Sequence, residues 1–308
     1  MTEKANRTAP GEPATQPPDR LSRSWLRTIL ELCKVPVTFG VILSAACGYF
    51  LFAEKVDPLT ALAVLGVFLL ACGASALNQV QEVRIDARME RTRLRPVPSG
   101  RLDPFVAVFI AVILILAGLY VLTSVDRHTT VLLALALFAV IWYNLVYTYL
   151  KRITAFAVVV GSLVGAAPPL MGWAAAGGDI RDPAILLVAL FMIIWQIPHF
   201  WLLVLMRGKE YERAGLPSPS RVFTQIQLAR ITFMWILAAV CAGFLTFLLM
   251  GIGFPWILIV LAASVWLITR SSMILRHNLE AQIIRSSFFR MIGYLVVVLV
   301  TLSLQALL

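Results

Sequence analysis

Long apolar runs separated by short polar stretches dominate the chain after residue 35. Nine runs stand out, at about residues 36–54, 58–77, 104–124, 129–149, 154–175, 183–206, 231–250, 255–270 and 288–308. Most approach the roughly 20 residues that a helix needs to cross a bilayer. Because backbone polar groups in lipid must be paired within the segment, continuous runs of this kind predict helices, whereas a membrane barrel has short alternating segments. The pattern predicts an all-α polytopic membrane protein with nine transmembrane helices.

The basic residues fall into alternate gaps between these runs. Of the 26 lysines and arginines, only Lys55, Arg127 and Arg181 lie in the other set of gaps. Because cytoplasmic loops are enriched in Lys and Arg, this distribution predicts a cytoplasmic N-terminus and places the longer polar loops in the cytoplasm. The topology also explains the net charge of +10, so we expect a lipid bilayer and no nucleic acid as the partner.

Composition supports a single membrane domain preceded by a tail. Only 14% of the residues are charged, against about 25% in soluble domains. Residues 1–27 are rich in proline, threonine and charge, which predicts a disordered cytoplasmic tail, with one transmembrane domain over residues 28–308. The tail lacks the apolar stretch of a cleaved signal and contains acids that transit peptides avoid. We therefore expect a bacterial inner membrane protein.

The stretch "NQVQEVRIDARMERTRLR", residues 78–95, follows the second apolar run directly. Asn78, Glu82 and Asp86 are spaced four apart, so on a helix they form one stripe at its cytoplasmic end. Oxygen-bearing side chains of this kind are the ligands that Mg²⁺ prefers, often together with substrate phosphates. The stripe predicts a site for Mg²⁺.

Five arginines accompany these acids: Arg84, Arg88, Arg91, Arg93 and Arg95. Guanidinium groups pair bidentately with phosphate oxygens, so acids and arginines together favour a metal–diphosphate site. The other interpretation is a topological anchor of solvated charges, and it suits Arg84, Arg88 and Arg93 in particular.

Two further polar clusters lie within or beside apolar runs, toward the ends that the topology places in the cytoplasm. Tyr147 and Lys151 share a helix face at the end of the fourth run, where they can contact phosphate or form an interfacial belt. His199 lies inside the sixth run, where an ionisable residue is a functional candidate by default. It can bind a ligand, ligate iron, or hydrogen-bond a neighbouring helix. Glu210 and Tyr211 are expected in the loop that follows.

The fifth run contains "GSLVGAAPPLMGW". Its small residues allow close approach of a neighbouring helix, and the two prolines are expected to break or kink the span. The four cysteines form no CxxC pair and are expected to be small core residues.

At these positions the chain resembles the UbiA-type intramembrane prenyltransferase superfamily, over roughly residues 30–305. The strongest match is "NQVQEVRIDARMERTRLRPVPSGRL", which fits the pattern of an asparagine, two acids and "DAxMxRTxxRPxPxG". "YTYLKR" matches a Tyr-x-x-x-Lys element. "GAAPPLMGW" and "WQIPHFW" resemble the members that prenylate haem more than those that prenylate quinone precursors.

The resemblance implies nine helices around a central cavity and a Mg²⁺-dependent reaction. A farnesyl group would pass from farnesyl diphosphate to a vinyl group of haem B, which is a substrate and not a prosthetic group. Metal and diphosphate binding would fall to the stripe and to basic residues, and the acceptor side to His199. The residues that the resemblance assigns are Asn78, Glu82 and Asp86 for the metal, Arg91, Arg95 and Lys151 for the diphosphate, and Lys34, Tyr147, Glu210 and Tyr211 around the substrates.

Two segments depart from the family pattern. "LCKVPVT" keeps Lys34 but lacks the expected arginine, and "EYERAGLPSPS" has Glu210 in place of an aspartate. The second departure bears on the acceptor more than on the reaction. Three alternatives therefore stay open: prenylation of an aromatic quinone precursor, a membrane transporter with polar sites, and a protein that binds haem without modifying it.

Overall fold

The structure is a computed structural model that describes residues 25–125, 129–276 and 280–308. These residues contain helices and no strands, which confirms the all-α prediction. Among them, nine helical segments are long and apolar enough to cross a bilayer. The spans are α2 (Val35–Ala53), α3 (Pro58–Gln81), α5 (Pro104–Thr123), Thr130–Leu150, Ala157–Ala175, α10 (Pro183–Arg213), α11 (Gln225–Leu249), Trp256–Leu275 and α13 (Ala281–Leu307).

Several of these spans are built from more than one element. The fourth comprises α6 (Thr129–Ile141), the π-helical turn η1 (Trp142–Tyr147) and α7 (Thr148–Leu150). The fifth comprises α8 (Ala157–Gly161) and α9 (Leu163–Ala175), and the eighth comprises α12 (Trp256–Ser271) and η3 (Ser272–Leu275). Three short helices lie outside the spans: α1 (Trp25–Leu32), α4 (Val83–Asp86) and η2 (Pro219–Arg221). Since α1 begins at Trp25, the last three residues of the predicted tail are helical; residues 1–24 lie outside the described residues.

Three spans begin with the same local signal, an aspartate followed by proline. Asp57, Asp103 and Asp182 are the N-caps of α3, α5 and α10, and each side chain accepts a hydrogen bond from a main-chain N–H in the first helical turn. The proline then occupies the first helical position, where its missing N–H costs nothing. Short turns of this type start the helices sharply at the membrane boundary.

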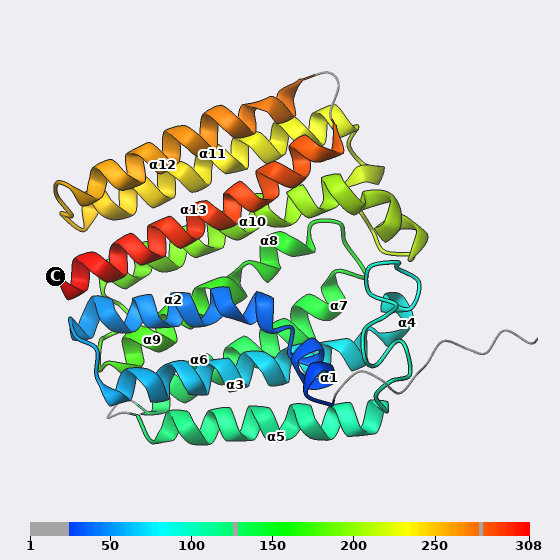
Figure 1. Ribbon diagram of the computed structural model, residues 1–308, viewed down its shortest axis with the longest axis horizontal. Coiled ribbons are helices and arrows are strands. Elements are labelled where there is room, and N and C mark those ends of the chain that lie inside the picture. Colours follow the sequence, from blue (N-terminus) through cyan, green and yellow to red (C-terminus); the bar gives the residue numbers. More distant parts are fainter. Residues whose placement is uncertain (1–24, 126–128, 277–279) are drawn as a thin grey trace, which may run out of the picture.

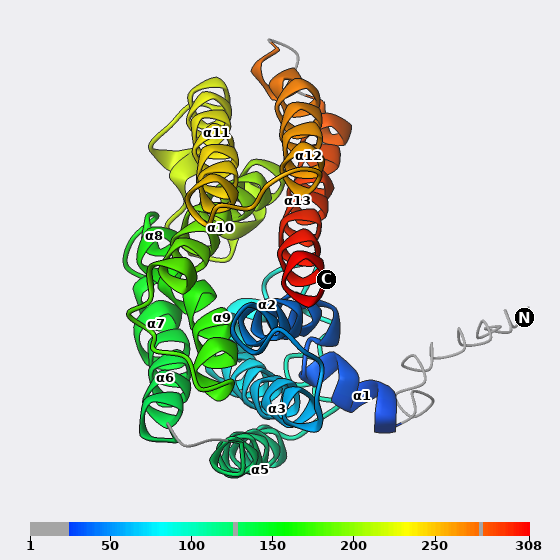
Figure 2. The same cartoon turned by 90° about the vertical axis from the view of Figure 1, so that its left-hand side faces the viewer.

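The spans pack into two groups with separate cores (Figures 1 and 2). One core lies among α2, α3, α5, α6 and α9, and the other mainly among α10, α11, α12 and α13. Contact between α2 and α9 is backbone to backbone: a Cβ atom on Gly48 would lie 2.0 Å from the carbonyl oxygen of Pro169. The small residues of the fifth span therefore serve close packing. Its interruption falls at Ser162, and both prolines lie within α9, so the predicted break is displaced from them.

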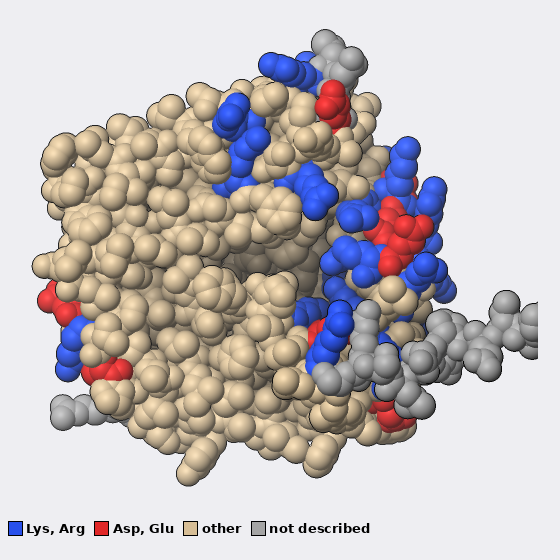
Figure 3. All heavy atoms as spheres, viewed as in Figure 1, with Lys and Arg blue, Asp and Glu red and all other residues tan. Residues whose placement is uncertain are grey.

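Charged side chains gather at one end of the molecule, where α1, α4 and the end of α10 lie, as Figure 3 shows. The opposite end carries few charges in this view, and the lateral surface is apolar. The same view shows a hollow between α2 and α13 that leads toward the charged end. This distribution is that of a multi-pass integral membrane protein, with its polar chemistry at one end of the bundle.

Candidate functional site

The helix that carries the predicted stripe is interrupted at Glu82, but the residues of the stripe keep their four-residue hydrogen-bonding pattern. α3 ends at Gln81, Glu82 has non-helical backbone angles, and α4 begins at Val83. The turns nevertheless continue in register, because Glu82 N donates to Asn78 O at 3.1 Å and Asp86 N to Glu82 O at 2.8 Å. Asn78, Glu82 and Asp86 are only 1%, 6% and 2% exposed as residues. The prediction of one helix is wrong in detail, and the three residues still stack one above another.

Each of these three side chains has its own cation. Lys34 Nζ donates to Asn78 Oδ1 at 2.8 Å, and Arg95 Nη1 lies 2.7 Å from Asp86 Oδ2. Glu82 forms an ion pair with Lys151. Carboxylates buried to this extent are stable only when they are paired, since an isolated buried charge costs several kcal/mol or more. The cations come from three separate segments, so folding is what assembles the cluster.

Lys34 connects the segment before α2 to this cluster. It is the N-cap of α2 and has left-handed backbone angles, with φ of 51°. Burial of its ammonium group lowers the pKa of Lys34 to about 7; repulsion from Arg95 and Lys151 adds to this effect, and Glu82 and Asp86 oppose it. These mutual interactions place acids and cations within electrostatic range of one another around Lys34.

Glu210, near the end of α10, is bonded to the segment that follows α4. Its Oε1 accepts a hydrogen bond from Arg91 N at 3.1 Å, and its Oε2 lies 3.7 Å from Arg207 Nη1. Glu210 and Tyr211 were expected in a loop, but both lie in the last turns of α10, which extends beyond the apolar run to Arg213. Tyr211 is within electrostatic range of Arg91 and Arg95.

Tyr147 lies beside the cluster and His199 lies apart from it. Lys151 Nζ is 5.3 Å from the centre of the Tyr147 ring. The His199 ring stacks between Trp195 and Phe288, with ring centroids 4.9 and 4.5 Å away, and its buried Nδ1 has no hydrogen-bond partner among the described residues. Eleven residues separate His199 from Glu210, about 16 Å along the helix axis.

Aromatic contacts bridge the two regions. Phe200 contacts both rings, with centroids 5.8 Å from His199 and 6.3 Å from Tyr147. Tyr147 in turn stacks on Tyr143 at 6.1 Å. An aromatic wall therefore runs from the polar cluster toward the middle of α10.

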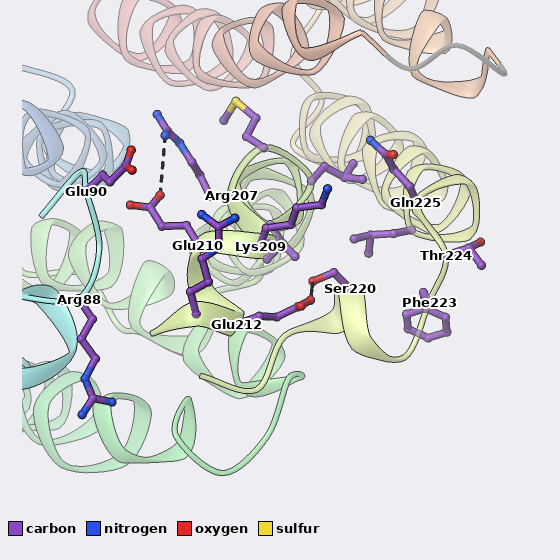
Figure 4. A pocket seen from close by; sticks show the side chains of 16 residues that line it. Arg88, Glu90, Arg207, Lys209, Glu210, Glu212, Ser220, Phe223, Thr224 and Gln225 are labelled. Atoms are coloured by element: carbon purple, nitrogen blue, oxygen red, sulfur yellow. Dashed lines mark hydrogen bonds and ion pairs between the residues drawn. The ribbon is translucent and has the colours of Figure 1, made fainter. Parts of the chain in front are cut away.

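Two cavities of about 650 Å³ each lie at the charged end of the molecule, and one of them adjoins the cluster. One lies between α1 and the segment after α4, and its lining includes Lys34, Arg91 and Arg95. The other lies at the end of α10, where Glu210 turns toward Arg207 while Glu212 turns toward Ser220 (Figure 4). The first cavity brings two of the predicted diphosphate ligands, Arg91 and Arg95, to one wall together with Lys34.

The other arginines of residues 78–95 lie at the surface and not in the buried cluster. Arg84, Arg88 and Arg93 are exposed, which agrees with the anchor interpretation, although Arg88 also lines the cavity at the end of α10. Arg91 is exposed too, and its guanidinium makes no ion pair with any described residue, so its side chain is available to an anion.

The donor atoms of the cluster suit a hard cation. Among the described residues, no three His, Cys, Asp or Glu side chains gather as a metal site. The oxygens of the cluster are the carboxylates of Glu82 and Asp86 and the amide oxygen of Asn78, and each of these groups faces a cation of the protein. Oxygens of these kinds are the ligands that Mg²⁺ prefers, whereas zinc sites are built mainly from His and Cys.

The sequence analysis did not identify the residues that support the cluster through hydrogen bonds and ion pairs. Asn78 Nδ2 donates to Thr148 Oγ1 at 3.1 Å, and Asn144 and Gln81 are hydrogen-bonded to each other. Arg101 pairs with Glu31, which ties α1 to the segment after α4. The available signal was weak: each is a single polar residue within or beside an apolar run.

Comparison with known proteins identifies a family and a fold. The model of the UbiA prenyltransferase family matches residues 36–293. A protein of Oleidesulfovibrio alaskensis named protoheme IX farnesyltransferase is 42% identical over 195 residues, covering 63% of this chain and 68% of that protein. A protein of Saccharophagus degradans with the same name is 38% identical over 217 residues, covering 68% and 71%.

Two solved structures share the fold. One, from a study of digeranylgeranylglyceryl phosphate synthase in membranes, superposes with a TM-score of 0.72 at 16% identity, covering 92% of this chain and 98% of that one. The other is a UbiA homologue from Archaeoglobus fulgidus bound to GPP and Mg²⁺, with a TM-score of 0.65 at 13% identity, covering 90% and 99%.

Proposed function

The chain belongs to the UbiA prenyltransferase family, and from this premise we propose that it transfers a farnesyl group from farnesyl diphosphate to a vinyl group of haem B. The predicted resemblance to this superfamily is confirmed by the family match and by relatives named protoheme IX farnesyltransferase. The observation that carries the proposal is the buried cluster in which Asn78, Glu82 and Asp86 each face a cation.

In this proposal Mg²⁺ is held by the oxygens of Asn78, Glu82 and Asp86. When bound there, the metal neutralises charge on the diphosphate leaving group. Mg²⁺ also accompanies a prenyl diphosphate in the Archaeoglobus fulgidus homologue. The proposal is supported by the hard oxygen donors of this cluster, which are the kind of ligand that Mg²⁺ prefers.

The basic residues hold the diphosphate and take up the charge that develops on it. Lys34, Arg91 and Arg95 share a cavity wall, and Lys151 approaches from the other side of the acids. When the bond between the allylic carbon and the diphosphate oxygen breaks, its electron pair leaves with the diphosphate. Fixed cations lower the barrier to this step because they stabilise the developing anion without rearrangement.

The aromatic wall faces the other product of that step, the allylic cation. Tyr147 and Tyr143 present stacked rings beside Lys151, and ring faces attract cations. The vinyl carbon of haem B then attacks the allylic carbon, and water adds to the resulting cation with loss of a proton, which leaves a hydroxyethylfarnesyl group. We assign His199 to the acceptor side; since its Nδ1 is enclosed, the opposite edge of the ring is the one that can meet the acceptor.

The proposed location is a bacterial inner membrane, with the diphosphate site facing the cytosol. The support is the alternation of basic residues between gaps and the collection of charges at one end of the bundle (Figure 3). Farnesyl diphosphate would then be supplied from the side on which its charged group is soluble.

One reconstitution tests both the reaction and the acceptor. Purified protein in lipid nanodiscs is incubated with farnesyl diphosphate, haem B and Mg²⁺, and products are identified by mass spectrometry. We expect haem that carries a farnesyl group and a hydroxyl group, and no such product when EDTA replaces Mg²⁺. Prenylation of an aromatic quinone precursor in place of haem would overturn the acceptor, and haem bound without any product would favour a binding protein.

A further inference from the structure

A π-helical turn interrupts the fourth span directly before the residues that enter the polar cluster. Within η1 (Trp142–Tyr147), Thr148 N donates to Tyr143 O, five residues earlier, where an α-helix would bond four residues earlier. A π turn accommodates one extra residue, so everything after it is rotated by about 100° relative to an uninterrupted α-helix. The direction in which Lys151 leaves the helix toward Glu82 therefore depends on this turn.

Two amide side chains, buried Asn144 and half-buried Gln81, hold the turn against α3. Asn144, which is 1% exposed, donates from Nδ2 to Ala74 O at 3.0 Å and to Gln81 Oε1 at 3.1 Å. In return, Gln81 Nε2 donates to Asn144 O, a main-chain carbonyl within the turn, at 3.2 Å. The side chain and the main chain of Asn144 are thus both bonded to α3, which fixes the turn in position and in rotation.

The same stretch of α3 carries the ligand stripe. Asn78 Nδ2 donates to Thr148 Oγ1 at 3.1 Å, and that hydroxyl donates to Tyr143 O at 2.9 Å. Since the hydroxyl proton is used in the second bond, Thr148 must accept from the amide nitrogen of Asn78, and Asn78 Oδ1 is left facing Lys34. The π turn therefore orients the predicted metal ligand Asn78 through Thr148, and it directs Lys151 toward the predicted metal ligand Glu82.

We propose that Asn144 and Gln81 are positioning residues of the metal–diphosphate site, which act by holding the π turn that directs Thr148 and Lys151 at Asn78 and Glu82. This inference rests on the proposed function, because it assigns the pair to the same site. A polar pair in a membrane span can also serve helix association alone. Only the positioning role requires that loss of the pair weakens metal and diphosphate binding selectively.

The test is a double-mutant cycle in which the binding of inorganic diphosphate is measured. Asn144→Leu, Gln81→Met and the double variant are titrated with inorganic diphosphate at several Mg²⁺ concentrations by calorimetry. We expect each single variant to weaken diphosphate binding about tenfold, which corresponds to about 1.4 kcal/mol, and to raise the Mg²⁺ concentration needed for half-saturation. The double variant should bind no more weakly than the worse single variant, because the two residues act as one unit.

Two Thr→Val substitutions distinguish a positioning effect from a general loss of stability. Thr148→Val removes the acceptor for Asn78 together with the bond from the same hydroxyl to Tyr143 O. Thr246→Val removes a buried hydroxyl in α11 that likewise bonds a main-chain carbonyl of its own helix, Ala242 O at 2.9 Å, far from the cluster in sequence and fold. Thr148→Val should raise the Mg²⁺ requirement several-fold, and Thr246→Val should leave it unchanged. Thermal unfolding in detergent should change by similar amounts in both.

The outcomes separate the two proposals. Unchanged Mg²⁺ requirement and diphosphate affinity in Asn144→Leu and Thr148→Val would overturn the positioning role, as would equal losses in Thr148→Val and Thr246→Val. Failure of the wild-type protein to bind diphosphate with Mg²⁺ would overturn it as well. Wild-type protein that binds diphosphate but does not farnesylate haem would instead overturn the proposed function and leave the positioning result standing.

Discussion

The two charged segments at the same end of the bundle are built in different ways. In the first, residues 78–101 (the first segment), Glu82 and Asp86 are almost fully buried and each is paired with a cation, while Glu90 is exposed. In the second, residues 207–224 (the second segment), Glu210 and Glu212 are only partly buried. Glu210 bonds the main chain of Arg91 and Glu212 bonds the Ser220 hydroxyl. The first segment is a preassembled charge cluster, and the second bonds to it through one carboxylate.

Burial determines how much each segment depends on its partners. Removing one partner of a buried ion pair typically costs about 3–5 kcal/mol, because the remaining charge stays unpaired. A partly exposed pair such as Glu210 with Arg207, at 3.7 Å, contributes about 0–1 kcal/mol. Substitutions in the first segment should therefore have large effects, and those in the second segment small ones. Four predictions test this difference, from the largest effect to the smallest.

Asp86→Asn should have the largest effect on turnover. The amide keeps the shape of the carboxylate but removes the charge that pairs with Arg95 and that would hold the metal. We expect kcat to fall by about 10²–10³-fold, the range found when a group that stabilises transition-state charge is lost. The measurement is single-turnover farnesyl transfer with saturating Mg²⁺.

Asp103→Asn is the control for this change. Asp103 lies near the same segment and caps α5 at the surface, and asparagine is an equally good N-cap. Its activity should match the wild type within about twofold. Near-normal activity in Asp86→Asn would contradict the metal–diphosphate assignment of the first segment.

Lys151→Met should have the second largest effect, on stability and activity together. Methionine fills the space of the lysine stem but leaves Glu82, which is 6% exposed, without its cation. We expect about 3 kcal/mol of lost stability and about a hundredfold lower kcat/KM for farnesyl diphosphate. Chemical unfolding in detergent and steady-state kinetics measure the two effects.

The double variant Lys151→Met, Glu82→Leu separates pairing from catalysis. Since it removes both charges, it should recover most of the lost stability while activity stays low. Recovery of both would mean that the pair is structural only.

Glu210→Gln should have a modest effect, because the glutamine oxygen still accepts from Arg91 N. The charged hydrogen bond becomes a neutral one, a loss of about 1 kcal/mol, or about fivefold in KM for farnesyl diphosphate. Glu210→Leu removes the acceptor as well and should be worse. Equal activity of both variants with the wild type would show that the connection between the two segments has no part in catalysis.

The fold was largely predictable from the sequence because lipid imposes a strong constraint. Apolar runs marked all nine spans, although the aspartate–proline pairs at the starts of three of them were not used. The end of α10 was missed, since the helix continues past the membrane as "RGKEYER", which is polar and helix-forming and which hydropathy cannot distinguish from a loop.

The polar residues that gather at this end of the bundle could be picked out from the sequence, but their pairing could not. Four-residue spacing identified Asn78, Glu82 and Asp86, which are close in sequence. Lys34 and Asn78 are 44 residues apart, and no periodicity relates them. The π turn η1 is likewise bonded to α3 through Asn144 and Gln81, which are 63 residues apart. His199 was found as an ionisable residue in a span, but its contact with the Phe288 ring of α13 is a tertiary feature.

Glu212→Gln should have the smallest effect, and it is the sharpest test of the difference between the segments. Glu212 points away from Glu210, toward Ser220 Oγ at 2.6 Å, so its charge faces η2 and not the first segment (Figure 4). Glutamine keeps an oxygen that can accept from that hydroxyl, and kcat/KM should stay within about twofold of the wild type, as for most surface substitutions. Steady-state kinetics beside Glu210→Gln gives the comparison. A loss as large as that of Glu210→Gln would mean that the second segment contributes two acids to the diphosphate site, and the site would then be shared between both segments.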